Sequence, residues 1–317
     1  MLLPKLTELD VIGKKVLLRL DLDTDPDPND LRIKSSEETL NYLKEKDAQI
    51  IILAHKGRPE GKIDESLSLK PFQPIFDKWG AKMEENLRFD PGEEGNNPEF
   101  AKKLASLGDC YVNEAFASSH RAHASIVGLP KLLPHAVGFR FQKEVENLSK
   151  VFDNPKRPLI FLISGLKEDK LGYVKAFESL ADKILVGGRL PDFLGDKALE
   201  SVRLQKGKVI IGNLIMDKED ITLNTIEVFS KEVKSGGTVV VSGPLGKYEE
   251  EGHRAGTEKV FIAVTSSGAF KIAGGGDTEK AISTLGLSDK FNWISVGGGA
   301  MLEFLSKKTL PGIEAFK

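Results

Sequence analysis

Arginine and histidine residues gather in the first half of the chain. Seven of the ten arginines and four of the five histidines precede residue 160. The early arginines are Arg19, Arg32, Arg58, Arg88, Arg121, Arg140 and Arg157. A guanidinium binds carboxylate or phosphate oxygens with a planar fork of N–H donors, so this asymmetry predicts an anion-binding site in the first half. For any single arginine, the alternative is a solvated surface residue.

Glycine runs follow two β-like stretches near the C-terminus. They are Gly274-Gly275-Gly276-Asp277-Thr278 and Gly297-Gly298-Gly299-Ala300, and a helix-like segment follows each. Glycine lets the backbone approach a phosphate, and a helix N-terminus offers free N–H donors. The alternative is a tight strand-to-helix turn without a ligand. The chain has neither a Walker P-loop pattern nor the G-x-G-x-x-G dinucleotide pattern.

Two lysines follow the apolar stretch 159–165. If a helix begins there, the i, i+3 spacing of Lys167 and Lys170 places both amines on one side. They could then neutralise phosphate oxygens. Alternatively, together with Glu168 and Asp169, they form an ordinary solvated loop.

Short β-rich runs alternate with amphipathic stretches throughout the chain, which predicts two doubly wound parallel α/β sheets. The predicted strands are 16–23, 49–57 and 109–115 in the first half and 159–165, 183–188, 209–213, 238–243, 269–276 and 293–299 in the second. Ser35 with Glu38 predicts a capped helix start, and Asn97-Pro98 predicts another. Ligands bind beyond the carboxyl ends of such strands, where the basic and glycine-rich segments lie.

A chain of 317 residues is long enough for two domains. Residues 142–153 place Val145, Leu148 and Phe152 on one helical face, and Pro155 and Pro158 then interrupt the pattern. We therefore expect domains at 1–150 and 151–317, and the last ~15 residues are expected to pack back on the first domain. A plain surface helix within one domain is the alternative for 142–153.

The composition excludes several function classes. A net charge of -2 with 29% charged residues disfavours a nucleic-acid partner. No stretch reaches the ~20 apolar residues of a membrane span, and the N-terminus lacks the pattern of a secretory signal. The single cysteine, Cys110, fits a reducing compartment. We expect a cytoplasmic monomer without membrane contact.

Taken in order, the motifs resemble those of phosphoglycerate kinases, glycolytic enzymes that exchange a phosphoryl group between 1,3-bisphosphoglycerate and ADP. In the first half, RLDLDTDP resembles the family's RVDFNVP, LRIKSS its RIxAA, AHKGRP its SHLGRP and NEAFASSHRAHAS its NDAFGTAHRAHAS, and ENLRF is shared. In the second half, SGLKEDK resembles GGAKVSDK, VVSGPLGKYE resembles VWNGPMGVFE, SVGGGAMLEFL resembles STGGGASLEFL, and GGGDT is shared. The resemblance implies two Rossmann-like domains joined by a hinge helix, with hinge closure before transfer.

The resemblance also implies the roles of individual residues. The phosphoglycerate-binding residues are expected to be Asp21, Asp23, His55, Arg58, Arg88, His120 and Arg121, with Arg32, Lys170, Gly275 and Gly298 as catalytic residues. The residues expected to bind ATP or ADP are Lys167, Lys170, Gly188, Pro244, Glu249, Gly274, Gly275, Gly276, Asp277 and Thr278, with Gly297 to Gly299 as a further backbone cradle. Asp277 is expected to hold Mg²⁺.

Several positions depart from the family pattern. Asp23 and Ser242 stand where the family has Asn, and Val296 stands where it has Thr. Arg189 and Pro191 replace glycine and alanine in a segment on the adenosine side, and little remains of the family's insert between 189 and 225. An ionised Asp23 is expected to repel the substrate acid unless a neighbouring arginine offsets its charge or the carboxyl group stays protonated.

Two alternatives to a kinase stay open. One is a non-catalytic phosphoglycerate-kinase-like protein that binds an anion as a sensor or scaffold. The other is a dinucleotide-dependent oxidoreductase on a similar fold, which the missing G-x-G-x-x-G pattern and the presence of Lys167 and Lys170 disfavour.

Overall fold

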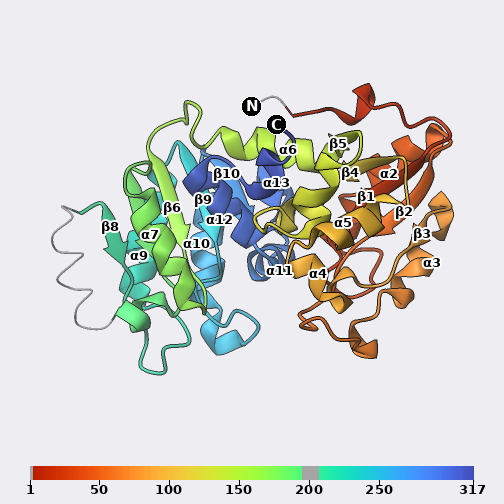
Figure 1. Cartoon of the computed structure of the whole chain (residues 1–317). Helices are drawn as coiled ribbons and strands as arrows, with labels where there is room; N and C mark the ends of the chain where they lie inside the picture. The colour runs from red at the N-terminus through yellow and green to blue at the C-terminus, as the bar shows by residue number, and fades with distance from the viewer. Residues whose placement is uncertain (1–2, 195–206) are drawn as a thin grey trace. The chain divides into compact units, whose positions relative to one another are not determined.

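The computed structural model describes residues 3–194 and 207–317. The chain forms two compact units (Figure 1). Unit 1 comprises Met1–Glu146 with Thr309–Lys317, and unit 2 comprises Asn147–Lys308. Each unit contains one parallel β-sheet with helices between its strands, which confirms the predicted α/β class.

Unit 1 is built on a five-stranded sheet in the order β3-β2-β1-β4-β5. Its strands are β1 (Lys15–Arg19), β2 (Gln49–Leu53), β3 (Lys82–Met83), β4 (Cys110–Asn113) and β5 (His135–Val137). Its helices are α1 (Leu31–Lys34), α2 (Glu37–Glu45), α3 (Gln73–Phe76), α4 (Pro91–Glu94), α5 (Pro98–Ala105) and α13 (Pro311–Glu314), and α6 (Phe139–Ser149) begins in it.

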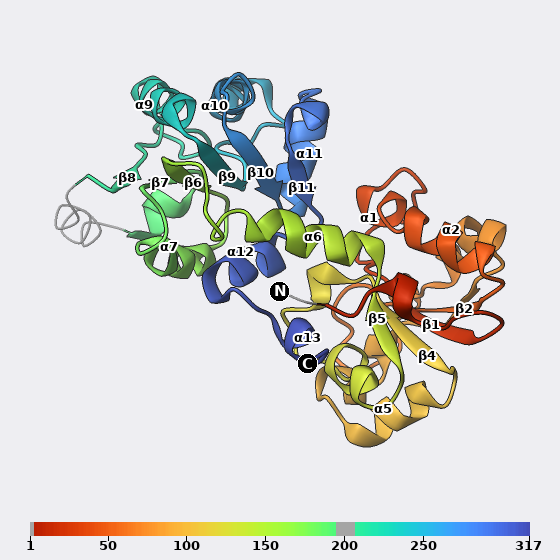
Figure 2. The same ribbon diagram turned by 90° about the horizontal axis from the view of Figure 1, so that it is seen from above.

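The two faces of this sheet bury different side chains, because successive residues of a strand point to opposite sides. On β1, Val16 and Leu18 join one apolar cluster with Leu40 of α2. Leu17 joins a second cluster with Leu104 of α5. In Figure 2, α2 and α5 lie on opposite sides of the sheet.

Unit 2 is built on a six-stranded sheet in the order β11-β10-β9-β6-β7-β8. Its strands are β6 (Leu159–Ile163), β7 (Lys183–Val186), β8 (Val209–Ile211), β9 (Thr238–Ser242), β10 (Phe270–Gly274) and β11 (Trp293–Ser295). Its helices include α7 (Leu171–Phe177), α9 (Leu223–Ser235), α10 (Ala255–Thr265), α11 (Gly276–Thr284) and α12 (Gly298–Lys307). In Figure 2, α9 and α10 cover one face, while α7 and α12 lie on the other. Phe161 of β6 stacks on Phe177 of α7 with ring centroids 4.2 Å apart.

The helix starts and strand ends differ in part from expectation. Asn97 caps α5 as predicted, because its side chain accepts hydrogen bonds from the N–H groups of Glu99 and Phe100. The predicted capping box at Ser35 is wrong: its hydroxyl donates to the Arg32 carbonyl, and α2 begins at Glu37. The first two strands end earlier than predicted, at residues 19 and 53, and the edge strands β3 and β5 were not predicted.

A buried carboxylate holds the start of α6. Glu114, which follows β4, accepts hydrogen bonds from the N–H groups of Arg140 (3.1 Å) and Phe141 (3.0 Å) and from the Thr39 hydroxyl (2.5 Å). A Cβ on Gly138 would lie 2.2 Å from a Glu114 oxygen, so glycine is required there. Burial raises the pKa of Glu114 to about 7. The helix runs from 139 to 149, three to four residues before the predicted 142–153.

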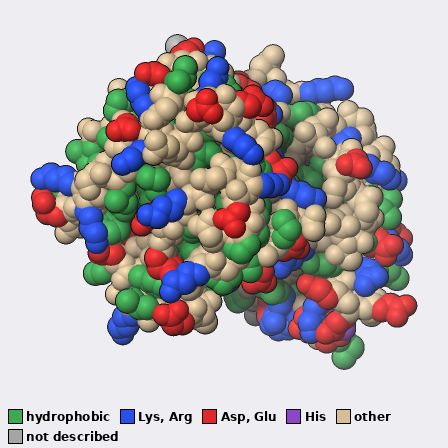
Figure 3. All heavy atoms as spheres, turned by 90° about the vertical axis from the view of Figure 1, so that its right-hand side faces the viewer, with side chains coloured by type: hydrophobic (Ala, Val, Ile, Leu, Met, Phe, Trp, Pro, Cys, Tyr) green, Lys and Arg blue, Asp and Glu red, His purple; other side chains and the backbone are tan. Residues whose placement is uncertain are grey.

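The surface carries charges of both signs. Basic and acidic side chains are interspersed on the face shown in Figure 3, in keeping with the small net charge of the chain. Among the residues that the structure describes, no helix has the length and apolar character needed to span a bilayer.

Candidate functional site

The carboxyl edge of the unit 1 sheet holds a buried ionic network centred on Arg19, the last residue of β1. Its guanidinium is completely buried. Nε donates to the Ser125 hydroxyl (2.9 Å), Nη2 lies 3.0 Å from Nδ1 of His55, and Nη2 lies 4.0 Å from Glu93 Oε1. Glu93 is also fully buried and accepts hydrogen bonds from the hydroxyl (2.6 Å) and the N–H (2.9 Å) of Ser125. The pair therefore ties the end of β1 to the segments that follow β2, β3 and β4.

Arg88 is a second buried guanidinium with donors left over. Its Nη1 donates to the Gly57 carbonyl (2.6 Å), and its Nε lies 3.2 Å from Glu94 Oε1. In the described chain its buried Nη2 has no hydrogen-bond partner. Burial, followed by the positive charge of Arg121, lowers the pKa of Arg88 to about 10. A buried cation with an open donor is suited to an anionic ligand, which would satisfy the donor and offset the charge.

The two buried histidines beside these arginines are neutral near pH 7. Burial and the charge of Arg19 lower the pKa of His55 well below its ordinary value. Burial and the charge of Arg88 lower the pKa of His123 to about 3. The positive charge of the site therefore comes from its guanidinium groups, and the imidazoles act as polar hydrogen-bonding groups.

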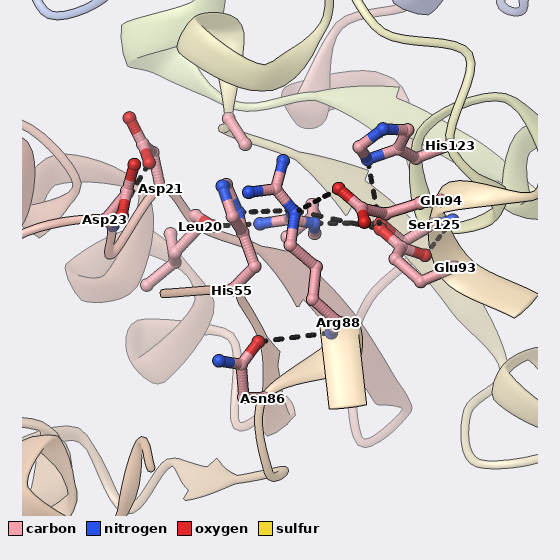
Figure 4. A network of polar contacts seen from close by, with 12 residues as sticks. Leu20, Asp21, Asp23, His55, Asn86, Arg88, Glu93, Glu94, His123 and Ser125 are labelled. Atoms are coloured by element: carbon pink, nitrogen blue, oxygen red, sulfur yellow. Dashed lines mark hydrogen bonds and ion pairs between the residues drawn. The ribbon is translucent and has the colours of Figure 1, made fainter. Parts of the chain in front are cut away.

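Asp21, Asp23 and Arg32 form a second group at the same edge. Arg32 Nε lies 3.6 Å from Asp21 Oδ2, and Arg32 Nη1 donates to the Asp23 carbonyl. The Asp23 side chain accepts a hydrogen bond from the Gly57 N–H (2.8 Å). Figure 4 shows Asp21 and Asp23 on one side of His55 and Arg88, with Glu93, Glu94 and His123 on the other. The Asp23 carboxylate is thus used as an acceptor within the loops.

The remaining predicted residues of unit 1 lie in the loops after β2 and β4. Arg58 is exposed in the loop after β2. Arg121 Nε donates to Nε2 of His120 (3.2 Å), and both are partly buried. Sequence reasoning missed Arg19, Glu93 and Ser125 as members of the network. Only the occurrence of an arginine in an apolar strand could have pointed to Arg19.

In unit 2, Lys170 is the buried cation at the carboxyl edge of the sheet. Its Nζ donates to the Ser164 carbonyl (2.7 Å) and lies 3.4 Å from the Ser242 carbonyl. A Cβ on Gly165 or Gly243 would lie 3.0 or 2.9 Å from Nζ, so both positive-φ glycines make room for the ammonium. Burial lowers the pKa of Lys170 to about 8, while the charge of Asp277 raises it.

The two glycine loops meet at the N-termini of α11 and α12. A Cβ on Gly298 would lie 2.6 Å from the Gly275 Cα, so the loops pack backbone to backbone. Neither helix has a side chain that caps its first N–H groups. The Thr278 hydroxyl donates to the Gly274 carbonyl (3.0 Å) and accepts from the Gly243 N–H (2.8 Å), which fixes the first loop. Adjacent uncapped helix N-termini are suited to phosphate oxygens.

A cavity of about 380 Å³ opens beside these groups. Of the predicted nucleotide-binding residues, Gly188, Pro244, Glu249 and Asp277 line it. Arg189, Lys218, Glu219 and Lys247 also line it, and of these the sequence analysis singled out only Arg189. Lys167 is exposed at the start of a short turn, whereas Lys170 is largely buried. The Ser242 hydroxyl is buried and, within residues 3–194 and 207–317, has no hydrogen-bond partner.

Asp277, the predicted metal ligand, is an exposed carboxylate of the first glycine loop and lines the cavity. In the ranges that the structure describes, no cluster of three or more His, Cys, Asp or Glu side chains could hold a metal ion. Mg²⁺ at nucleotide sites takes one or two carboxylates and completes its shell with water and phosphate oxygens. An exposed carboxylate beside uncapped helix N-termini therefore fits Mg²⁺ that arrives together with a phosphorylated ligand.

Comparison with known proteins gives one family. The sequence model described as phosphoglycerate kinase matches residues 6–84, 77–194 and 195–308. Phosphoglycerate kinase from Herpetosiphon aurantiacus is 35% identical over 378 residues, covering 96% of this chain and 96% of that protein. The one from Dictyoglomus turgidum is 35% identical over 383 residues, covering 97% and 96%. Because these alignments are longer than 317 residues, the relatives contain segments without a counterpart here.

Solved structures give the same result. The phosphoglycerate kinase from Coxiella burnetii matches with a TM-score of 0.84 at 29% identity, covering 99% of both chains. The one from Pyrococcus horikoshii matches with a TM-score of 0.82 at 25% identity, covering 98% of both chains.

Proposed function

The chain belongs to the phosphoglycerate kinase family, and we propose that it transfers a phosphoryl group between 1,3-bisphosphoglycerate and a nucleoside diphosphate. The family resemblance implies that this nucleotide is ADP. The acceptor in the reverse direction is the carboxylate of 3-phosphoglycerate. Unit 1 binds the phosphoglycerate and unit 2 the nucleotide. The enzyme acts in glycolysis, in the cytoplasm, as a monomer.

The observation that carries this proposal is the placement of Lys170. A largely buried ammonium lies beside positive-φ glycines at the carboxyl edge of the sheet, in the unit that also holds two uncapped helix N-termini. Phosphoryl transfer needs positioning and cancellation of charge on the transferring oxygens, with little covalent chemistry from the protein. A largely desolvated lysine supplies such a charge at greater strength than an exposed one.

The phosphoglycerate site rests on the arginines of unit 1. Arg88 offers its Nη2, which has no hydrogen-bond partner in the described part of the chain, and Arg121 and Arg58 follow other strands of the same sheet. We assign these three to the phosphate group that is not transferred. Arg32, held near Asp21, is assigned to the carboxylate end, where it stabilises charge on the transferring group.

The nucleotide phosphates are assigned to the glycine loops, and the ribose to Glu249. Backbone N–H groups at Gly275 to Asp277 and at Gly298 to Gly299 would donate to phosphate oxygens. Mg²⁺, held by Asp277 and the nucleotide itself, would neutralise charge on those oxygens when bound. Lys170 holds the transferring oxygens from the side of β6 and β9. Transfer requires donor and acceptor oxygens in line, so hinge closure about α6 is part of the proposal.

A coupled assay with 3-phosphoglycerate, ATP and Mg²⁺ tests the proposal. We expect turnover that depends on all three components and falls sharply in Lys170→Met. If the protein binds 3-phosphoglycerate in calorimetry but shows no turnover with any nucleoside triphosphate, it is a sensor or scaffold and the kinase proposal is wrong.

A further inference from the structure

The cavity of unit 2 extends from the phosphate end towards the strand that precedes Arg189. The glycine loops follow β10 and β11, whereas Arg189 follows β7, three strands away from β10 in the sheet. At about 4.8 Å per strand, this separation is roughly 14 Å along the sheet edge, which suits an extended nucleoside diphosphate. If Asp277 marks the phosphate end and Glu249 the ribose, Arg189 lies where the base would be.

Arg189 is the cation of this cavity whose donors are least used. Lys218 Nζ lies 2.6 Å from Asp192 Oδ1, and Lys247 Nζ donates to Glu250, so each ammonium has a close carboxylate partner. The carboxylates nearest to Arg189 lie farther away: its Nη2 is 3.7 Å from Asp192, and its Nη1 is 3.8 Å from Glu219. Its Nε is buried and finds no hydrogen-bond partner in the described part of the chain. A guanidinium has five donors, so several remain for a ligand.

Glu219 supplies a hydrogen-bond acceptor beside Arg189 in the same cavity. Its side chain is one-third exposed and lines the cavity, and its backbone carbonyl accepts from the Lys247 N–H (2.9 Å), which fixes its loop. The charged side chains that line the cavity are Arg189, Lys218 and Lys247 against Glu219, Glu249 and Asp277, three of each sign. The cavity therefore offers a donor next to an acceptor, with no surplus positive charge for an additional phosphate.

We infer that Arg189 and Glu219 read the purine edge of the nucleotide, so that the cavity binds GDP more tightly than ADP. This inference rests on the proposed function. Guanine presents two acceptors, O6 and N7, to an arginine fork and carries an exocyclic 2-amino donor. Adenine presents N7 beside an N6 amino donor, which faces a guanidinium unfavourably. Guanine thus satisfies both side chains more fully.

Calorimetric titration of the full-length protein with GDP, IDP and ADP, each with Mg²⁺, tests the inference. IDP keeps the 6-oxo group but lacks the 2-amino group, so it separates the two contacts. We expect the affinity to decrease from GDP through IDP to ADP, with GDP bound about 10- to 100-fold more tightly than ADP. Binding of ADP as tight as that of GDP would overturn the inference.

Variants assign the preference to residues. Arg189→Gly should weaken GDP and IDP about 10- to 100-fold and ADP much less, which removes the preference of IDP over ADP. Arg189→Lys keeps the charge but not the fork and should lose most of the same preference. Glu219→Ala should remove only the preference of GDP over IDP. Lys247→Ala removes a cation already paired with Glu250 and should leave all three ratios unchanged.

The outcomes separate this inference from the kinase proposal. Equal weakening of all three nucleotides in Arg189→Gly would show that Arg189 is structural or binds phosphate, and would refute it as a base-reading residue. Turnover measured in parallel with ATP and GTP tests the kinase itself. Tighter binding of GDP without turnover supports the base assignment and refutes the kinase proposal. Turnover combined with tighter binding of ADP supports the kinase proposal and refutes the base assignment. Failure to bind any of the three nucleotides refutes both.

Discussion

Lys170→Met removes the buried ammonium of unit 2 and keeps a side chain of similar length. In the folded protein, burial lowers the pKa of Lys170 from 10.5 to about 8. This difference corresponds to roughly 3 kcal/mol of unfavourable free energy for the charged form in the folded state, since 1.36 kcal/mol accompanies each pKa unit. Near pH 7, where the group is charged, the wild type bears this cost and the variant does not.

The sign of the stability effect follows from the direction of the shift. Between pH 8 and 10.5 the unfolded chain keeps the proton on this lysine while the folded chain loses it, so wild-type stability rises with pH in that window. Methionine has no proton to lose. The free energy of unfolding of the variant relative to the wild type should therefore fall by up to about 3 kcal/mol across the window. Urea unfolding at a series of pH values measures it.

Activity should change in the opposite sense to stability at neutral pH. Loss of a cation from the transferring phosphoryl group lowers kcat by roughly 10³- to 10⁵-fold. In the wild type, kcat/KM should fall above about pH 8 as the free enzyme loses the Lys170 proton. The exposed Lys175 of α7 provides the matched control, and Lys175→Met should keep the wild-type kcat and pH profile. A Lys170→Met enzyme with kcat within tenfold of the wild type would refute the assignment.

Three further substitutions test the site and its supports. Arg121→Ala should weaken 3-phosphoglycerate binding by about 1.5–3 kcal/mol in calorimetry, because a charge-assisted hydrogen bond is lost, and should leave nucleotide affinity unchanged; equal loss of both would contradict the assignment. Gly298→Ala places a Cβ 2.6 Å from the Gly275 Cα, so nucleotide affinity should fall while 3-phosphoglycerate affinity stays, and an unchanged nucleotide Kd would argue against the cradle. In the folded protein the pKa of Glu114 is raised from 4.5 to about 7, so the free energy of unfolding of the wild type should decrease by about 3 kcal/mol as the pH rises from 4.5 to 7. Glu114→Gln should abolish this decrease in urea unfolding, and the same pH dependence in both proteins would contradict the prediction.

The features that sequence reasoning could predict depend on local pattern. The apolar runs at β6, β7 and β9 and the glycine loops after β10 and β11 are visible as short continuous segments, because parallel strands are buried on both faces. The helix cap at Asn97 is also predictable from local sequence, because its side chain accepts hydrogen bonds from N–H groups only two and three residues later. The short edge strands β3 and β5 carry too few residues to show a period.

The centre of the unit 1 network could not be predicted, because its contacts join residues far apart in sequence. Arg19 bonds to Ser125 across 106 positions, and Ser125 in turn bonds to Glu93. In sequence, Arg19 is one charged residue in an apolar strand, and Glu93 lies in the four-residue helix α4. Their complete burial follows only once the loops after three strands meet at the sheet edge. The resemblance to a family pointed to His55, but not to Arg19, which contacts it.

The two units prepare for anions in different ways, and this difference decides which substitutions each tolerates. Unit 1 offers guanidinium groups: Arg88 donates to a carbonyl and lies beside a carboxylate, and its buried Nη2 has no hydrogen-bond partner among the described residues. There we expect a change of charge at an arginine to weaken anion binding. Unit 2 uses backbone N–H groups and a single ammonium, and a Cβ on Gly243 would lie 2.0 Å from the Ser164 carbonyl oxygen. There one methyl group is as damaging as a lost charge. Arg189 adds a further side-chain donor to the cavity beside these glycine loops, and recognition of a base edge needs such a donor.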